Sequence, residues 1–166
     1  MEVKFYLVFI TALFPLIVGA IWYSNALFGK TWMRVSGMTE EKVQSGNMAL
    51  IFGLTYVLGV FLSGAMLTWS IHQFSTESLF ATQPGFAEGT GIYFEFIQEF
   101  HQKFGSLHRS FGHGAVHGVV GTLFIVLPVI AINSLFERRG WKYVMVHTGY
   151  WLVTLILICG VLCQFA

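Results

Sequence analysis

Residues 111–136 read FGHGAVHGVVGTLFIVLPVIAINSLF, and this stretch decides the class of fold. It contains no Asp, Glu, Lys or Arg, and a helix of about 20 mostly apolar residues is long enough to cross a bilayer. Comparable runs occupy about 5–23, 48–71 and 143–165. We therefore predict an all-α, polytopic membrane bundle with four transmembrane helices, forming a single integral membrane domain over residues 1–166.

The composition supports a membrane protein whose main partner is the lipid bilayer. Only 10% of the residues are charged and 55% are hydrophobic, whereas a soluble domain is about 25% charged. The net charge of +1 provides no basic surface for nucleic acid. No Asp is present, and no nucleophile or phosphate-loop motif predicts an enzyme.

The basic residues predict how the chain is oriented. The segments that follow the first and third apolar runs carry six of the nine: Lys30, Arg34, Lys42, Arg138, Arg139 and Lys142. By the positive-inside rule these segments lie in the cytoplasm, so both termini lie outside. Basic and Trp side chains also anchor membrane boundaries. The predicted cytoplasmic interface anchors are Lys30, Trp32, Arg138, Arg139 and Trp141.

Three stretches carry a resemblance to a known family: WYSNALFGKTWM (22–33), FGHGAVHG (111–118) and LFERRGWKYVMVHTGYWLV (135–153). Together they resemble the bacterial domain-of-unknown-function 1761 family, over nearly the whole chain. The resemblance implies a small four-helix protein of the bacterial inner (plasma) membrane. It implies no activity, substrate or catalytic residue.

Residues 72–110 form the longest connection. The first part, 72–91, is rich in Ser, Thr and Gly and predicts an irregular external loop. From Tyr93 to Phe111 apolar residues recur at intervals of three and four, which predicts an interfacial amphipathic helix before the third span. If that helix continues into the span, Glu95 and Glu99 share a face with His113 and His117. His101 and His108 are predicted to flank the apolar stripe.

The histidines are the candidate site. His113 and His117 lie one helical turn apart, and His72, at the outer end of the second span, is the nearest predicted partner. Gly114, Gly118 and Gly121 occupy the adjacent face, where small side chains allow another helix to approach closely. His113 and His117 are therefore predicted to point into the bundle. Cys159 and Cys163 are predicted to be small core residues.

Three functions fit this pattern. The sequence favours a non-enzymatic accessory or structural subunit, or a bundle that forms a homo-oligomer or binds a membrane-protein partner through its glycine face. The first alternative is an outward-facing metal or haem site with His113, His117 and His72 as ligands. The second is a small proton-coupled transporter that uses the same histidines as a proton relay. No zinc-protease or covalent haem motif accompanies them.

Overall fold

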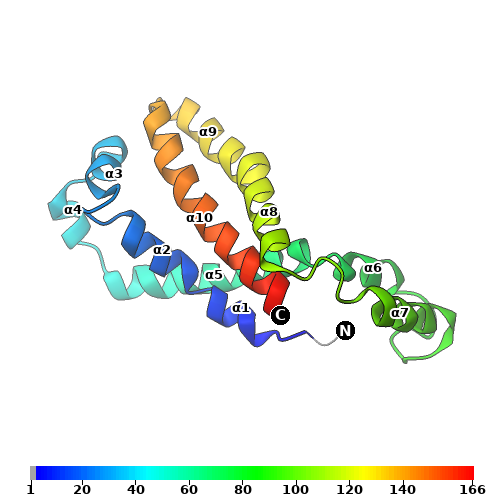
Figure 1. Cartoon of the computed structure of the whole chain (residues 1–166). Coiled ribbons are helices and arrows are strands. Elements are labelled where there is room, and N and C mark those ends of the chain that lie inside the picture. Colours follow the sequence, from blue (N-terminus) through cyan, green and yellow to red (C-terminus); the bar gives the residue numbers. More distant parts are fainter. Residues whose placement is uncertain (1–2) are drawn as a thin grey trace.

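The computed structural model describes residues 3–166, which are helical and contain no strand within that range (Figure 1). The helices, in chain order, are α1 (Tyr6–Thr11), α2 (Phe14–Trp22), α3 (Gly29–Ser36), α4 (Glu40–Gln44), α5 (Met48–Ser70), α6 (Gln73–Phe80), α7 (Gly91–Phe104), α8 (Phe111–Gly121), the π-helical turn η1 (Thr122–Val126), α9 (Leu127–Phe136) and α10 (Trp141–Phe165). The all-helical part of the prediction is confirmed.

Three helices are long and apolar enough to cross a membrane: α5, the continuous run α8–η1–α9 over Phe111–Phe136, and α10. They suggest a membrane protein, and they match three of the four predicted spans to within two residues at each end. The first predicted span, 5–23, is shorter and consists of two helices, so the structure does not establish it as a fourth span.

The break between α1 and α2 follows from Pro15. A proline has no N–H, so it cannot donate to the carbonyl four residues earlier, which here belongs to Thr11, and its ring crowds that carbonyl. The helix α1 ends at Thr11, and Pro15 lies in the first turn of α2, where a proline is tolerated. The carbonyl group of Pro15 itself accepts a hydrogen bond of 2.9 Å from the Tyr150 hydroxyl, which links α2 to α10.

The central helix is α10, whose one side contacts α8 and whose other side contacts α1 and α2 (Figure 1). A core at one end of the bundle joins α1, α5 and α10 and consists of Val8, Leu67, Ile71, Ile158, Leu162 and Ala166. Towards the other end, Trp22 Nε1 donates to the Val146 carbonyl over 3.1 Å. These contacts hold α1 and α2 along the length of α10.

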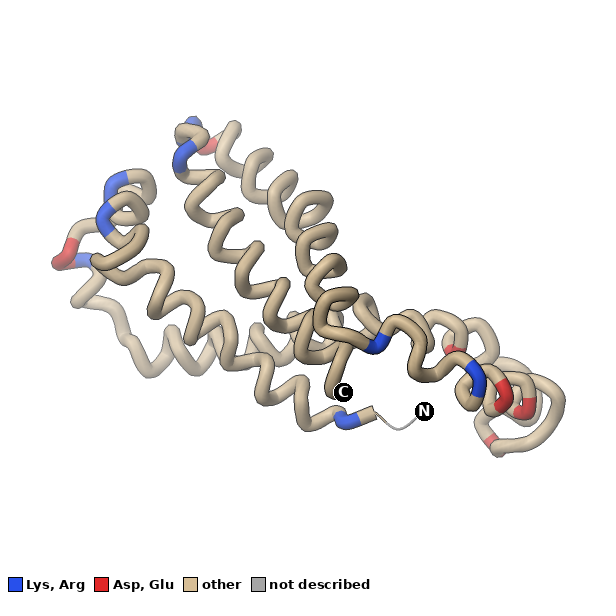
Figure 2. The backbone as a smooth tube through the Cα atoms, viewed as in Figure 1, with Lys and Arg blue, Asp and Glu red and all other residues tan. Residues whose placement is uncertain are grey.

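The charged residues lie at the ends of the apolar helices and on the segment between α5 and α8 (Figure 2). The segment between α2 and α5 is mostly helical and carries Lys30, Arg34 and Lys42, and the turn between α9 and α10 carries Arg138 and Arg139. Both regions lie at the same end of the bundle (Figure 2). The structure thus places at one end the basic residues on which the predicted orientation depends.

The segment between α5 and α8 differs from the prediction. It forms an arm that extends sideways from the end of the bundle (Figure 1). The prediction of an irregular loop over 72–91 is wrong for its first half, because α6 forms there and Phe80 stacks on Tyr93 of α7 with ring centroids 5.7 Å apart.

Burial lowers the pKa of His101 in the arm, and the Glu77 carboxylate, 3.3 Å from His101 Nε2, raises it in part.

The helix does not continue from α7 into α8. It ends at Phe104, and the backbone turns at His108, which has a φ of 60°. The side chain of Ser110 then begins α8 by accepting a hydrogen bond from the His113 N–H over 3.3 Å. A single polar face from Glu95 to His117 therefore does not exist.

Candidate metal centre

Three histidine side chains meet where α5 and α8 approach each other at the arm end of the bundle. His72 lies two residues after the end of α5, and His113 and His117 lie on the first two turns of α8. The two positions on α8 are four residues apart, so their side chains lie on one face of the helix. The structure thus brings together all three histidines that the sequence singles out.

The ring nitrogens of these three residues converge. His113 Nε2 lies 2.9 Å from His72 Nε2 and 3.1 Å from His117 Nε2. One potential ligand atom from each histidine lies within 4.8 Å of the other two. His113 and His117 are half-buried and His72 is exposed, so the cluster is open to the surroundings on the His72 side.

Two further aromatic residues surround the histidine cluster, here defined as His72, His113 and His117. The His108 ring stacks on His113 with centroids 4.8 Å apart. The rings of Trp69 on α5 and His117 are nearly perpendicular, at 85°, with centroids 6.4 Å apart. The prediction that His108 merely flanks the apolar stripe of the surface helix is wrong, because the turn after α7 carries it to the cluster.

Glycines position α8 against α10. A Cβ atom on Gly118 would lie 2.6 Å from backbone atoms of Leu155 and Ile156, and one on Gly114 would lie 2.6 Å from Cys163 Cβ. Gly121 is less crowded, since its nearest such contact is a Leu155 side-chain atom at 4.0 Å. The glycine face is therefore occupied by α10 of the same chain, and it is not a free seam for another protein.

Polar contacts hold the turn that leads into α8. Arg109 Nε donates to the Cys163 carbonyl over 2.7 Å, and another guanidinium nitrogen donates to the Ala166 carbonyl. Gln73 Nε2 donates to the carbonyls of Phe104 and Leu107 over 3.1 Å each. These bonds tie the chain on both sides of His108 to α10 and to the start of α6. Cys159 and Cys163 are buried free thiols.

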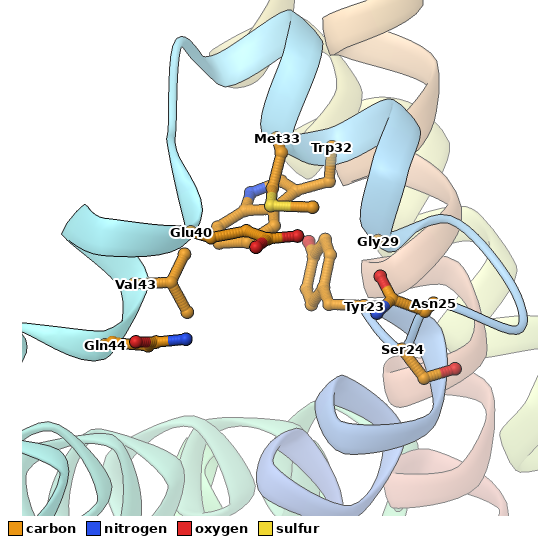
Figure 3. A pocket seen from close by; sticks show the side chains of 9 residues that line it. All are labelled: Tyr23, Ser24, Asn25, Gly29, Trp32, Met33, Glu40, Val43 and Gln44. Carbon is orange, nitrogen blue, oxygen red and sulfur yellow. The ribbon is translucent and has the colours of Figure 1, made fainter.

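The residues predicted as interface anchors lie at the other end of the bundle. Arg139 is paired with Glu137 over 2.6 Å and donates to the Val35 carbonyl over 3.3 Å. Arg138 lies in the same turn and has a φ of 54°. Lys30 and Trp141 are both exposed, near the first residues of α3 and α10. Trp32 instead packs on Tyr23, with ring centroids 5.3 Å apart, and lines a cavity (Figure 3).

The donor set of the histidine cluster suits a transition-metal ion. Imidazole nitrogens bind zinc, copper, nickel and iron, at about 2.0–2.1 Å for zinc. Three such bonds to one tetrahedral ion place the nitrogens about 3.3 Å apart, close to the two separations of 2.9 and 3.1 Å. A haem bound between two of these rings would have to enter between centroids that lie 4.8–5.0 Å apart, which leaves no room for its plane.

The fold and the cluster together define a class: helical proteins with apolar, membrane-length helices and three convergent histidines at one end. The chain belongs to the family described as "Protein of unknown function (DUF1761)", whose family model matches residues 6–163. The resemblance seen in the sequence is thereby confirmed. No curated protein and no solved structure matches the chain.

Proposed function

We propose that this protein is an integral membrane protein that binds one divalent transition-metal ion through His72, His113 and His117. The observation that carries the proposal is the convergence of three imidazole nitrogens within 4.8 Å of one another. The sequence favours an accessory or structural subunit, and the geometry of the cluster is the reason for preferring metal binding. Association with a second copy or another membrane protein, and proton-coupled transport, stay predictions.

The arrangement of the nitrogens is better suited to a metal than to hydrogen bonding alone. A neutral imidazole carries one N–H and one acceptor nitrogen, yet His113 Nε2 faces the Nε2 atoms of two other rings. Protonated rings at these distances repel one another. A metal ion instead accepts a lone pair from each nitrogen, and a three-histidine site leaves a fourth position for water or a substrate.

A metal titration tests the proposal. The full chain, purified in mild detergent without a polyhistidine tag, is titrated with Ni²⁺ while tryptophan emission is followed, because Trp69 lies beside His117. We expect quenching that saturates at one equivalent and is reversed by Zn²⁺. The variant with His72, His113 and His117 all replaced by alanine is expected to show none.

The matched control replaces the two histidines that lie far from the cluster, His101 in the arm and His147 on α10. This His101→Ala, His147→Ala variant keeps the same cluster and is expected to titrate like the wild type. Equal quenching of the wild type and the triple variant would overturn the proposal.

We further propose that α1 and α2 together form a fourth span, so that both termini lie outside a bacterial inner membrane. Their contacts with α10 support this: Val8 and Leu162 belong to the same core at one end, and Trp22 bonds to Val146 at the other. The sixteen-residue step from Val146 to Leu162 corresponds to about 24 Å of helix, most of the roughly 30 Å hydrocarbon core.

Cysteine labelling tests this topology. Lys4→Cys and Ala26→Cys place exposed thiols at the two ends of the α1–α2 pair, and the native Cys159 and Cys163 are buried. In intact spheroplasts, a membrane-impermeant maleimide is expected to label Lys4→Cys and not Ala26→Cys, with the wild type as the blank. Labelling of both positions from outside would show that α1 and α2 do not span.

A further inference from the structure

A groove opens at the end of the bundle opposite the histidine cluster. It consists of two cavities, of about 470 and 770 Å³, which share Tyr23, Trp32 and Val43 in their linings. The smaller cavity lies between the end of α2 and the helices α3 and α4 (Figure 3). The larger one lies between α2 and α5, with Tyr150 of α10 at its wall. The two form one site with a polar and an apolar part.

The smaller cavity has the chemistry of a site for a cationic group. Its only charged lining residue is Glu40, whose carboxylate points towards the Tyr23 hydroxyl across the cavity (Figure 3). Trp32 adds a second aromatic ring, and Asn25 and Gln44 add amides. A carboxylate beside aromatic rings attracts an ammonium group both by charge and by the cation–π interaction.

The larger cavity has the chemistry of a site for hydrocarbon. Its walls are mostly aliphatic and aromatic side chains, including Leu16, Ile17, Ile51 and Phe52. The cavity has a volume of about 770 Å³, and a space with apolar walls does not hold water well. An acyl chain from the surrounding bilayer fills such a space without burying a polar group.

Charges on the same helices complement the rest of a lipid head group. Lys30 and Arg34 on α3 and Lys42 on α4 lie outside the cavity lining, at this same end of the bundle (Figure 2). We propose that the groove binds a phospholipid with a primary ammonium head group, of the phosphatidylethanolamine type. Glu40 and the rings of Tyr23 and Trp32 hold the ammonium, a neighbouring base holds the phosphate, and an acyl chain occupies the larger cavity.

Quenching by brominated lipids tests this proposal independently of metal binding. The full chain is reconstituted into mixed bilayers in which either phosphatidylethanolamine or phosphatidylcholine carries brominated acyl chains. The contribution of Trp32, which lines both cavities, is obtained as the difference between the wild type and Trp32→Phe. We expect brominated phosphatidylethanolamine to quench Trp32 at least about threefold more effectively than brominated phosphatidylcholine.

The matched variants are Glu40→Gln and Glu41→Gln, neighbours on α4 of which only Glu40 lines the cavity. Glu40→Gln is expected to abolish the preference and Glu41→Gln to keep it. Equal quenching by both lipids in the wild type would show unselective lipid contact, and an unchanged preference in Glu40→Gln would exclude the carboxylate; each overturns the proposal. Absence of quenching by either lipid would show that protein covers the groove, which also overturns it.

Discussion

Replacing Gly118 with leucine is expected to destabilise the protein by about 3 kcal/mol or more. A Cβ at this position would lie 2.6 Å from backbone atoms of Leu155 and Ile156, and backbone in the middle of α10 cannot rotate away as a side chain can. Overpacking of this kind costs about 1–3 kcal/mol, and leucine adds three carbons beyond the Cβ. For a chain of this size the unfolding temperature in detergent should fall by roughly 6–12 °C.

The control uses a glycine of the same helix. A Cβ on Gly112 meets nothing within 4 Å, and glycine is a poorer helix former than other residues by up to about 1 kcal/mol. Gly112→Leu is therefore expected to leave the unfolding temperature unchanged or slightly raised. If Gly118→Leu unfolds at the same temperature as Gly112→Leu, the close approach of α8 to α10 is wrong.

Replacing His113 with alanine is expected to weaken metal binding by more than about 100-fold. His113 is the central member of the cluster, since its Nε2 atom lies 2.9 Å from that of His72 and 3.1 Å from that of His117. Changes to residues that only support a ligand cost about 10–100-fold in metal affinity, so loss of a ligand should cost more. The dissociation constant for Ni²⁺ or Zn²⁺, measured in detergent, gives the result.

The neighbouring His108 provides the comparison. Its ring stacks on His113 but contributes no nitrogen to the group that converges within 4.8 Å. His108→Ala is therefore expected to weaken binding by about tenfold at most, while the circular dichroism of both variants matches the wild type. An equal loss in His108→Ala and His113→Ala would mean that the ion is not held at the position that we propose.

The apolar runs were enough to predict most of the fold. Three of them are single helices whose ends fall within two residues of the prediction, because uncharged stretches of this length have few other structures available in a membrane. The two parts of the first run could have been predicted as well, since Pro15 lies inside it. The single span was predicted from the length and composition of the run, and Pro15 was the residue within it that could break the helix.

The break before α8 was harder to predict, because Phe104, Leu107 and Phe111 keep a helical spacing across it. Local signals were present: Gly105 follows the last residue of α7, and Ser110 is a favourable residue for the start of a helix. These signals compete with the periodicity, so the sequence left open whether the surface helix continues into the span. His108 was missed as a neighbour of the cluster for this reason.

The pairing of His72 with His113 was predicted only from estimated depth in the membrane. The two residues are 41 positions apart, and their contact depends on how α5 leans against α8 and α10, which is a property of packing that periodicity does not contain. The spacing of His113 and His117, by contrast, determined that these two share a helix face. The sequence thus identified the three residues of the cluster, and only the structure shows their nitrogens converging.

The π-helical turn η1 has a consequence for sequence alignment. Its hydrogen bonds run from residue i to i+5, so Thr122–Val126 accommodates one residue more than an α-helix needs between the same two ends. A relative that lacks one residue here can form a regular α-helix with little movement of its neighbours. In family alignments, a single-residue gap in the third apolar run belongs within 122–126, which keeps His113 and His117 in register on one side and the basic turn in register on the other.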